Sequence, residues 1–329
     1  MSDEKPLIGI DLGGTNIQIG IGSAEGDVLA RAKRKTEADE GRDAVLGRVV
    51  SGIEDCCKDI GITLEDIGAA GIGVPGPVDD RAGVVVEAVN LRWVNEPVGS
   101  ILSEKLGMPV TLENDVNVAI YGEWKKGAGR GATDLLGAWV GTGVGGAFIL
   151  NNELYRGHFQ SAGEIGHMII EPENPPGARS LEHNCSRTAI CNRLRYLIEA
   201  NRPSIVPSLV DGKLNKIKSK VVADAYSRGD ELTVEVVHDA ADRLGVTLGS
   251  LVTALSLQRI VLGGGLTEAI GEIWVEQVRA AIHRVVFPVP TRAVEVVATE
   301  LADNAGVIGA AMLARLKAGA SDEAAVTTS

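Results

Sequence analysis

The chain has 329 residues, which is enough for two domains of about 150 residues each. Its formal net charge is −12 and its one dense basic run, 31–35, is short, which argues against a nucleic-acid partner because that affinity comes largely from neutralising phosphates. Aromatic residues make up only 3%, so the core must be built from Val, Ile, Leu and Ala, as in buried parallel strands packed with helices.

Targeting and redox signals are absent from the sequence. The start MSDEKP is polar, and no apolar run approaches the ~18 residues of a membrane span, so we expect no membrane partner. Four cysteines (Cys56, Cys57, Cys185 and Cys191) are too few and too irregularly spaced for a disulfide framework. These features predict a protein of the reducing cytoplasm.

The first elements form a unit of three strands. Residues 6–10 are apolar and end at the turn Asp11 to Thr15, after which Ile alternates with Gln or Gly over 17–21, a strand period. A turn at 25–27 leads into a third strand over 28–31. The unit therefore consists of a strand, a glycine-rich turn, a strand, a turn and a strand.

Helices and strands alternate over the next hundred residues. We predict a helix over 43–60, a buried strand over 67–74, a helix over 98–106 and a strand over 109–112. This last strand runs into Glu113-Asn114-Asp115, and an apolar helix over 118–124 follows. Polar side chains at the carboxyl end of a buried strand occupy the usual ligand position of an open α/β sheet. Asn or Asp here can also be a helix N-cap.

The stretch 136–167 repeats the opening unit after a glycine linker at 127–133, which predicts a domain boundary there. It consists of a strand, the turn Gly141 to Gly143, a second strand to Leu150 and a loop that carries Glu164 and His167. Clustered glycines let a backbone approach a phosphate, or form a tight hairpin without a ligand. The repeat predicts an internal duplication of one αβ unit.

The last part of the chain is mostly helical. We predict helices over 181–200, 209–229, 234–257, 273–285 and 306–316, strands over 259–262 and 293–298, and a frayed tail from Ala318 to Ser329. The turn Gly263 to Gly265 directly follows the strand 259–262. It is the third glycine-rich turn behind an apolar strand.

These three turns suit a nucleotide. None has the Gly-Lys-Thr/Ser of a P-loop or a GxGxxG that opens a helix, so backbone N–H groups and the hydroxyls of Thr15 and Thr142 would hold the phosphates. The mirrored pair of turns, together with Asp115 at a strand end, predicts a two-lobed phosphotransferase with the nucleotide between its lobes.

The motifs DLGGTN, VPGPVDD, END, GTGVGGAFI, GEIGH and VLGGGL occur in an order that resembles the ROK family (repressors, open reading frames, kinases), from about residue 8 to 316. The resemblance implies an α/β, two-lobed actin-like ATPase fold with duplicated ribonuclease-H-like domains and a nucleotide cleft between them. The small N-terminal lobe would be 1–127, with the helix 304–317 packed back on it, and the large C-terminal lobe 128–303, with a disordered tail over 318–329.

The same resemblance implies an ATP- and Mg²⁺-dependent hexose kinase, most simply a glucokinase that acts on the 6-hydroxyl, in a homodimer or homotetramer. Fructose, N-acetylglucosamine, N-acetylmannosamine and allose are alternative acceptors, and polyphosphate is an alternative donor. A non-catalytic sugar-sensing regulator is the second hypothesis. Because the chain starts six residues before its first strand, we expect no room for the DNA-binding domain of the family's repressors, which favours a kinase.

Residue by residue, the resemblance makes Asp115 the catalytic base and Asp11 the carboxylate near Mg²⁺, acting through water. The sugar-binding set is Asn114, Asp115, Glu164, His167 and Glu182, with Asn90 and Gly76 as weaker matches. The phosphate loops are Gly13, Gly14 and Thr15, and Gly141, Thr142 and Gly143. Gly264 and Gly265 fall in the adenosine loop.

One family feature is missing from the sequence. ROK proteins commonly hold a structural zinc with three cysteines of a Cys-x-Cys-Gly-x-x-Gly-Cys segment and the histidine that matches His167. Here Ser180 stands at the third cysteine and the first two have no counterpart. We therefore predict no structural zinc, with a rescue by His183 and Cys185 as the alternative. Another contact, from the Pro175-Pro176 loop, would then orient His167.

Overall fold

The computed structural model describes residues 5–23 and 26–327, and the chain divides into two compact units. Unit 1 comprises Met1–Arg130, Arg156–Ser161 and Asp303–Ser329, and unit 2 comprises Gly131–Tyr155 and Ala162–Ala302. The short segment 156–161 thus belongs to unit 1, although the chain on both sides of it belongs to unit 2. Within the described ranges, no helix is both long and apolar enough to cross a membrane.

The main sheet of unit 1 has the strand order β3-β2-β1-β4-β8. Its strands are β1 (Leu7–Leu12), β2 (Asn16–Gly22), β3 (Val28–Lys35), β4 (Ala69–Val74) and β8 (Val110–Asn114). The first three pair antiparallel, and β4 and β8 continue parallel to β1. A small antiparallel sheet of β5 (Val78–Asp79), β6 (Val84–Ala88) and β7 (Trp93–Glu96) completes the unit's strands within the described residues.

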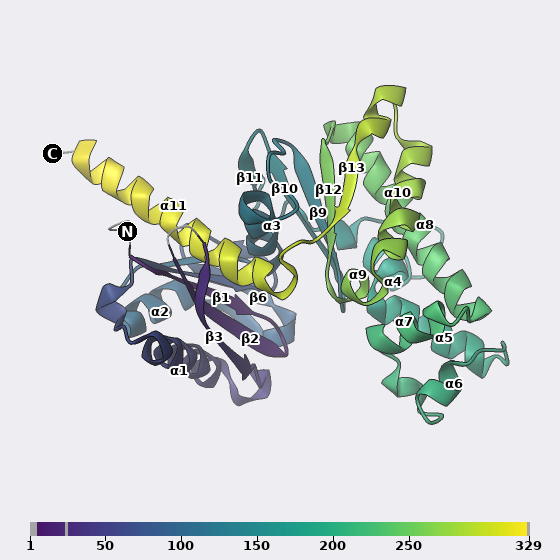
Figure 1. Cartoon of the computed structure of the whole chain (residues 1–329), viewed down its shortest axis with the longest axis horizontal. Helices are drawn as coiled ribbons and strands as arrows, with labels where there is room; N and C mark the ends of the chain where they lie inside the picture. The colour runs from purple at the N-terminus through teal and green to yellow at the C-terminus, as the bar shows by residue number, and fades with distance from the viewer. Residues whose placement is uncertain (1–4, 24–25, 328–329) are drawn as a thin grey trace. The chain divides into compact units, whose positions relative to one another are not determined.

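Alternation along β1 determines which helix covers each face of this sheet. Ile8 and Ile10 are buried in one core with the apolar side of α1 (Arg42–Ile60), while Gly9 between them faces the opposite side. A Cβ at Gly9 would lie 1.9 Å from the carbonyl oxygen of Val307. The backbone of α11 (Ala305–Thr327) therefore lies directly on the sheet, as Figure 1 shows. Among the described residues, the other α-helices of the unit are α2 (Val98–Leu106) and α3 (Asp115–Lys126).

Unit 2 repeats this plan. Its sheet has the order β11-β10-β9-β12-β13, formed by β9 (Leu135–Val140), β10 (Val144–Leu150), β11 (Glu153–Tyr155), β12 (Arg259–Gly263) and β13 (Glu295–Ala298). Again the first three strands are antiparallel and the last two run parallel to the first. The same order and the same directions in both sheets confirm the predicted duplication.

The helices of unit 2 bury the apolar side of its sheet. α8 (Glu231–Leu255) and α10 (Glu272–Val285) pack side by side, and their buried side chains share one core with β9 and β12 (Figure 1). α9 (Gly265–Ile270) is a short helix that the sequence analysis did not predict, and it follows directly after the third glycine-rich turn.

Two predicted helices are interrupted. The predicted helix 181–200 is two helices, α4 (Leu181–Cys185) and α5 (Arg187–Glu199), because Ser186 is extended (φ −66°, ψ 159°) and its hydroxyl caps α5 by accepting from Ala189 N at 3.1 Å. The predicted helix 209–229 is α6 (Val206–Leu209) and α7 (Ser219–Ser227), separated by left-handed residues at Asp211 and Gly212.

The chain's last helix is longer than predicted. α11 continues to Thr327, whereas we predicted a disordered tail from Ala318, and residues 328–329 lie outside the described part of the chain. Residues 318–327 are rich in Ala, which has the highest intrinsic helix propensity. An apolar period is therefore not required for helix there, although its absence was the basis of the prediction.

Candidate active site

The end of β8 in unit 1 holds the predicted catalytic residue Asp115 and the predicted sugar-binding residue Asn114. Asn114 is the N-cap of α3: its Oδ1 accepts from the backbone N–H groups of Val116 at 2.9 Å and Asn117 at 3.0 Å, and its Nδ2 donates to the carbonyl oxygen of Gly76 at 3.0 Å. Asp115 is the first helical residue, and its Oδ1 accepts from Val116 N at 2.9 Å. The capping alternative thus holds for Asn114, and its cap places Asp115 at a fixed point where α3 begins.

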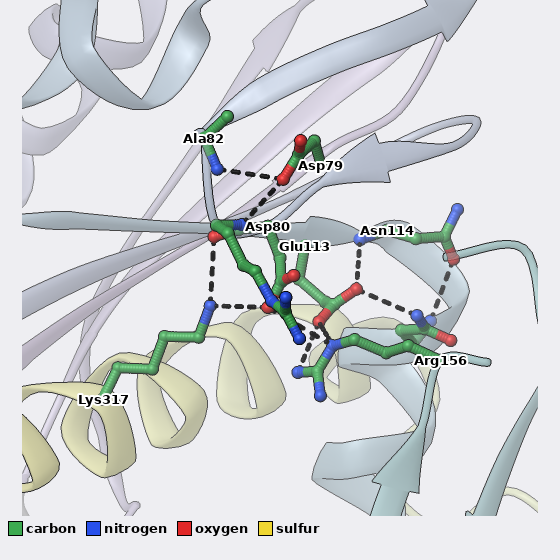
Figure 2. A network of polar contacts seen from close by, with 9 residues as sticks. Asp79, Asp80, Ala82, Glu113, Asn114, Arg156 and Lys317 are labelled. Atoms are coloured by element: carbon green, nitrogen blue, oxygen red, sulfur yellow. Dashed lines mark hydrogen bonds and ion pairs between the residues drawn. The ribbon is translucent and has the colours of Figure 1, made fainter. Parts of the chain in front are cut away.

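Glu113, the residue before Asn114, holds the backbone at this point through hydrogen bonds of its buried carboxylate. Its side chain is 2% exposed, and its Oε1 accepts from Asn114 N at 3.1 Å and from Asn117 Nδ2 at 2.9 Å. Its Oε2 accepts from Nε and Nη2 of Arg156, each at 2.7 Å (Figure 2). A buried carboxylate is tolerated because a cation and two amide donors satisfy its oxygens.

Asp80 extends the network around Glu113 to the last helix. Its carboxylate lies 3.6 Å from Arg156 Nε and accepts from Lys317 Nζ of α11 at 2.9 Å. Figure 2 shows the two cations approaching the two carboxylates from different elements. The network ties β8, the segment 156–161 and α11 together inside unit 1.

Among the predicted site residues, Asp11 has a carboxyl whose pKa is shifted strongly upward. Burial, together with the nearby carboxylates of Asp115 and Asp303, raises the pKa of its carboxyl to about 7. A Cβ at Gly306 would lie 2.8 Å from Asp11 Oδ2, so the first turn of α11 covers this carboxyl closely. Carboxyl groups that are crowded together resist ionisation, and a bound cation would stabilise their ionised forms.

Carboxylate oxygens are the ligand type that a hard divalent cation such as Mg²⁺ prefers. Among the described residues, no three His, Cys, Asp or Glu side chains converge closely enough to hold a metal ion together. Mg²⁺ usually takes one or two carboxylates and completes its shell with water and substrate phosphate oxygens. Asp11 would contact such an ion through a bound water molecule. The ion's own ligands would be water and phosphate oxygens.

The glycine turn of unit 1 lies beside the predicted sugar residue Asn90. Thr36 fixes the turn by donating its hydroxyl to the carbonyl oxygen of Gly13 at 2.6 Å and its N–H to that of Thr15 at 3.0 Å. A Cβ at Gly14 would lie 3.0 Å from Asn90 Cβ. The structure thus brings Gly14 and Asn90 together, two residues that the sequence assigns to different substrates.

In unit 2, the predicted sugar residue Glu182 contacts the second glycine turn. Glu182 Oε2 accepts from Val144 N at 2.9 Å, and a Cβ at Gly143 would lie 2.2 Å from the same oxygen. Glycine at 143 therefore has a steric reason: any side chain would displace Glu182. The turn itself is closed by Gly141 N donating to Gly143 O at 2.9 Å.

Glu164 precedes a 3-10 turn, η4 (Ile165–His167), whose last residue is His167, and this turn packs against Val144 and Glu182. A Cβ at Gly166 would lie 2.1 Å from the carbonyl oxygen of Val144 and 3.5 Å from Glu182 Cβ. The side chains of Glu164 and His167 are 43% and 78% exposed, with 3.9 Å between Glu164 Oε2 and His167 Nε2. Both are therefore accessible to a ligand.

The third glycine turn adjoins the second. Gly264 has a φ of 85°, and a Cβ there would lie 2.7 Å from the carbonyl oxygen of Val140, the residue before Gly141. Unit 2 thus gathers both of its predicted nucleotide turns and three predicted sugar residues around the start of β10, and unit 1 gathers Asp11, Asn90, Asn114 and Asp115 around the ends of β1 and β8.

The alternative zinc ligands do not fit a metal site. Cys185 is fully buried in the core of unit 2, and burial raises the pKa of its thiol to about 12, whereas zinc needs the thiolate. His183 Nδ1 is hydrogen-bonded to Ser180 Oγ at 2.8 Å. Backbone hydrogen bonds close the loop instead, from Leu181 N to Met168 O and from Ile170 N to Arg179 O, both at 2.9 Å.

Three residues near these elements received no role from the sequence: Glu113, Arg156 and Arg187. Arg187 opens α5 and donates from Nη2 to the hydroxyl of Thr142 at 2.6 Å. Glu113 stood in the quoted END motif, which was the available signal. Arg156 and Arg187 gave none, since their partners lie 43 and 45 residues away in the chain.

Comparison with known proteins identifies the family of this chain. The model of the ROK family matches residues 7–317, nearly the whole chain. The chain belongs to the ROK family. Within it, the chain is 32% identical to the glucokinase of Thermotoga maritima, over 95% of this chain and 98% of that protein. It is 27% identical to the xylose repressor of Caldicellulosiruptor bescii, over 93% of this chain and 77% of the repressor.

Among solved structures, the fold is similar to that of a ROK family glucokinase from Streptomyces griseus in complex with glucose and AMPPNP. The TM-score is 0.83 at 30% identity, and the match covers 94% of this chain and 99% of that one. The predicted two-lobed, actin-like ATPase fold of duplicated units is confirmed by this likeness and by the matching strand orders. ROK membership therefore fixes the fold, and the family includes both kinases and regulators.

Proposed function

We propose that this ROK family protein is an ATP-dependent sugar kinase that phosphorylates a hexose, with glucose at its 6-hydroxyl as the first candidate. The observation that carries the proposal is the carboxylate of Asp115, fixed at the start of α3 by the Asn114 cap and electrostatically coupled to Asp11. A general base and a metal-associated carboxylate are the two acidic groups that phosphoryl transfer requires. The relatives named glucokinase support the same activity.

In this mechanism Asp115 orients the attacking hydroxyl and accepts its proton as the sugar oxygen attacks the γ-phosphorus. The bond between the γ-phosphorus and the bridging oxygen to the β-phosphate breaks, which yields a sugar phosphate and ADP. Bound Mg²⁺ would neutralise charge on the phosphates near Asp11. Because the transition state is loose, Asp115 serves mainly to orient the hydroxyl and receives the proton late.

Sugar selection would depend on Glu164, His167 and Glu182. A carboxylate and an imidazole that remain accessible, beside a second carboxylate held by Val144 N, can bond to several hydroxyls at once. A site that pairs with a substrate hydroxyl strongly rejects an analogue that lacks it, because its own polar groups then stay unpaired. His167 would be oriented by the backbone-closed loop around Ser180 in place of a zinc ion.

The test is an ADP-release assay across glucose, fructose, N-acetylglucosamine, N-acetylmannosamine and allose, with ATP and then polyphosphate as donor. We expect ATP and glucose to give the highest kcat/KM. Asp115→Asn should lower kcat by roughly 10²- to 10⁴-fold, whereas Asp59→Asn, on the exposed side of α1, should not. An unchanged kcat in Asp115→Asn would overturn the assigned role.

The second candidate is a sugar-sensing regulator, favoured by the likeness to a xylose repressor. Such a protein would bind sugar in calorimetry yet release no ADP with any acceptor or donor. The two readings therefore differ in one measurement on the wild-type protein.

A further inference from the structure

Arg187 lies against the second glycine turn, where three hydrogen bonds from Arg187 and Thr188 hold the start of α5. Arg187 donates its backbone N–H to Gly141 O at 3.0 Å and its Nη2 to Thr142 Oγ1 at 2.6 Å. The next residue, Thr188, donates its hydroxyl to Thr142 O at 2.7 Å. The start of α5 is thereby fixed to the turn on both sides of the Arg187 side chain.

The break at Ser186 puts Arg187 in this place. In an uninterrupted helix over 181–200, residue 187 would continue the axis of α4, whereas here it is the first residue of a new helix capped by Ser186. A cation at a helix N-terminus is unfavourable, because the helix dipole already places positive charge there. The first turn of α5 contains no acidic residue to offset it.

The positive charge of Arg187 has no carboxylate counter-ion among the residues that the structure describes. Within the part of the chain that the structure describes, Arg187 has no carboxylate within ion-pair distance, and its guanidinium uses one N–H group, on Thr142. Eleven other arginines of the same range do form ion pairs with Asp or Glu.

We propose that Arg187 binds the phosphoanhydride chain of the phosphoryl donor at the turn Gly141 to Gly143. The planar guanidinium presents paired N–H groups that match phosphate oxygens, and the remaining N–H groups of Arg187 point from a position already fixed on the turn. This inference rests on the proposed function and adds to it a residue that selects the donor. ATP and inorganic polyphosphate share the chain that Arg187 would recognise.

The experiment measures binding by calorimetry on the full chain, with ATP, inorganic tripolyphosphate and adenosine as three separate probes. Arg187→Ala should weaken ATP roughly 10- to 100-fold, since it removes hydrogen bonds to a charged group, and leave adenosine within twofold. If the donor site accepts polyphosphate, tripolyphosphate should weaken in parallel; if it accepts only nucleotide, tripolyphosphate should fail to bind the wild type as well.

Three further variants separate binding from support of the turn. Arg187→Lys keeps the charge and should recover part of the ATP affinity. Arg187→Gln keeps a donor for Thr142 without the charge and should not recover ATP affinity. If Arg187 only supported the turn, Arg187→Gln would recover ATP affinity and Arg187→Lys would not. Arg193→Ala removes one exposed cation two turns along the same helix and should leave ATP binding within twofold. Thermal unfolding of each variant confirms that it is folded.

ATP affinity within twofold of wild type in Arg187→Ala, or an equal loss in Arg193→Ala, would overturn the proposal. Sugar phosphorylation by the wild type, assayed in parallel, is a separate readout. If no sugar is phosphorylated while ATP binding still depends on Arg187, the kinase proposal fails and this inference stands.

Discussion

Replacing Arg156 by Met tests the buried ion pair between Arg156 and Glu113, next to Asn114 and Asp115. The substitution keeps most of the apolar stem and removes the two N–H groups that lie 2.7 Å from Glu113 Oε2. Glu113 is 2% exposed, so its charge would remain buried without its cation. Breaking a buried pair from one side costs about 3–5 kcal/mol, and because Arg156 itself is 24% exposed we expect a loss in the lower part of that range, about 3–4 kcal/mol.

The assay is urea unfolding of the wild type, Arg156→Met, Glu113→Gln and the double variant. Once Glu113 is neutral, loss of Arg156 leaves no uncompensated charge, so the double variant should be more stable than the sum of the single losses predicts, by about 1–3 kcal/mol. Additive losses, or a loss below about 1 kcal/mol in Arg156→Met, would refute the reasoning. In the folded fraction, kcat should fall in Arg156→Met more than the KM for ATP rises.

Three other outcomes follow from the same structure. Because the pKa of Asp11 is raised to about 7, the ligand-free protein should lose stability as pH rises from about 4 to about 7, by at most about 4 kcal/mol, and Asp11→Asn should flatten that part of the thermal-denaturation profile. Gly309→Ala should destabilise by at least about 3 kcal/mol in urea unfolding, since its Cβ would lie 1.7 Å from Val118 O, whereas Gly47→Ala, in open space on α1, should stabilise by about 0.5–1 kcal/mol. Elemental analysis of the purified protein should find no stoichiometric zinc; one equivalent would contradict the reading of the loop around Ser180.

Local patterns predicted the strand units well. The Ile alternation over 17–21 and the glycine turns at 13–15 and 141–143 reflect burial on one face and close backbone approach, and both leave a direct trace in the residue order. Motif order then gave the family, which explains why most of the candidate residues could be named before any geometry was known.

Interactions between distant residues left no such trace. Ser186 sits inside an apolar period that continues through it, so only the extended backbone reveals that one predicted helix is two. Arg156 and Arg187 resemble ordinary surface arginines until the fold brings them to Glu113 and Thr142. For Asn114, the sequence allowed both an N-cap role and a ligand-binding role. The hydrogen bonds of its side chain, including the one to Gly76 O, became known only from the structure.

The central claim is that Asp115 makes this chain a sugar kinase. The most direct measurement is phosphorus NMR of a reaction that contains the wild-type protein, ATP, Mg²⁺ and glucose, repeated with Asp115→Asn. We expect glucose 6-phosphate and ADP with the wild type, and with Asp115→Asn a rate at least about 10²-fold lower while calorimetry shows glucose still bound. Equal product formation by both proteins, or none by the wild type with any acceptor, would contradict it.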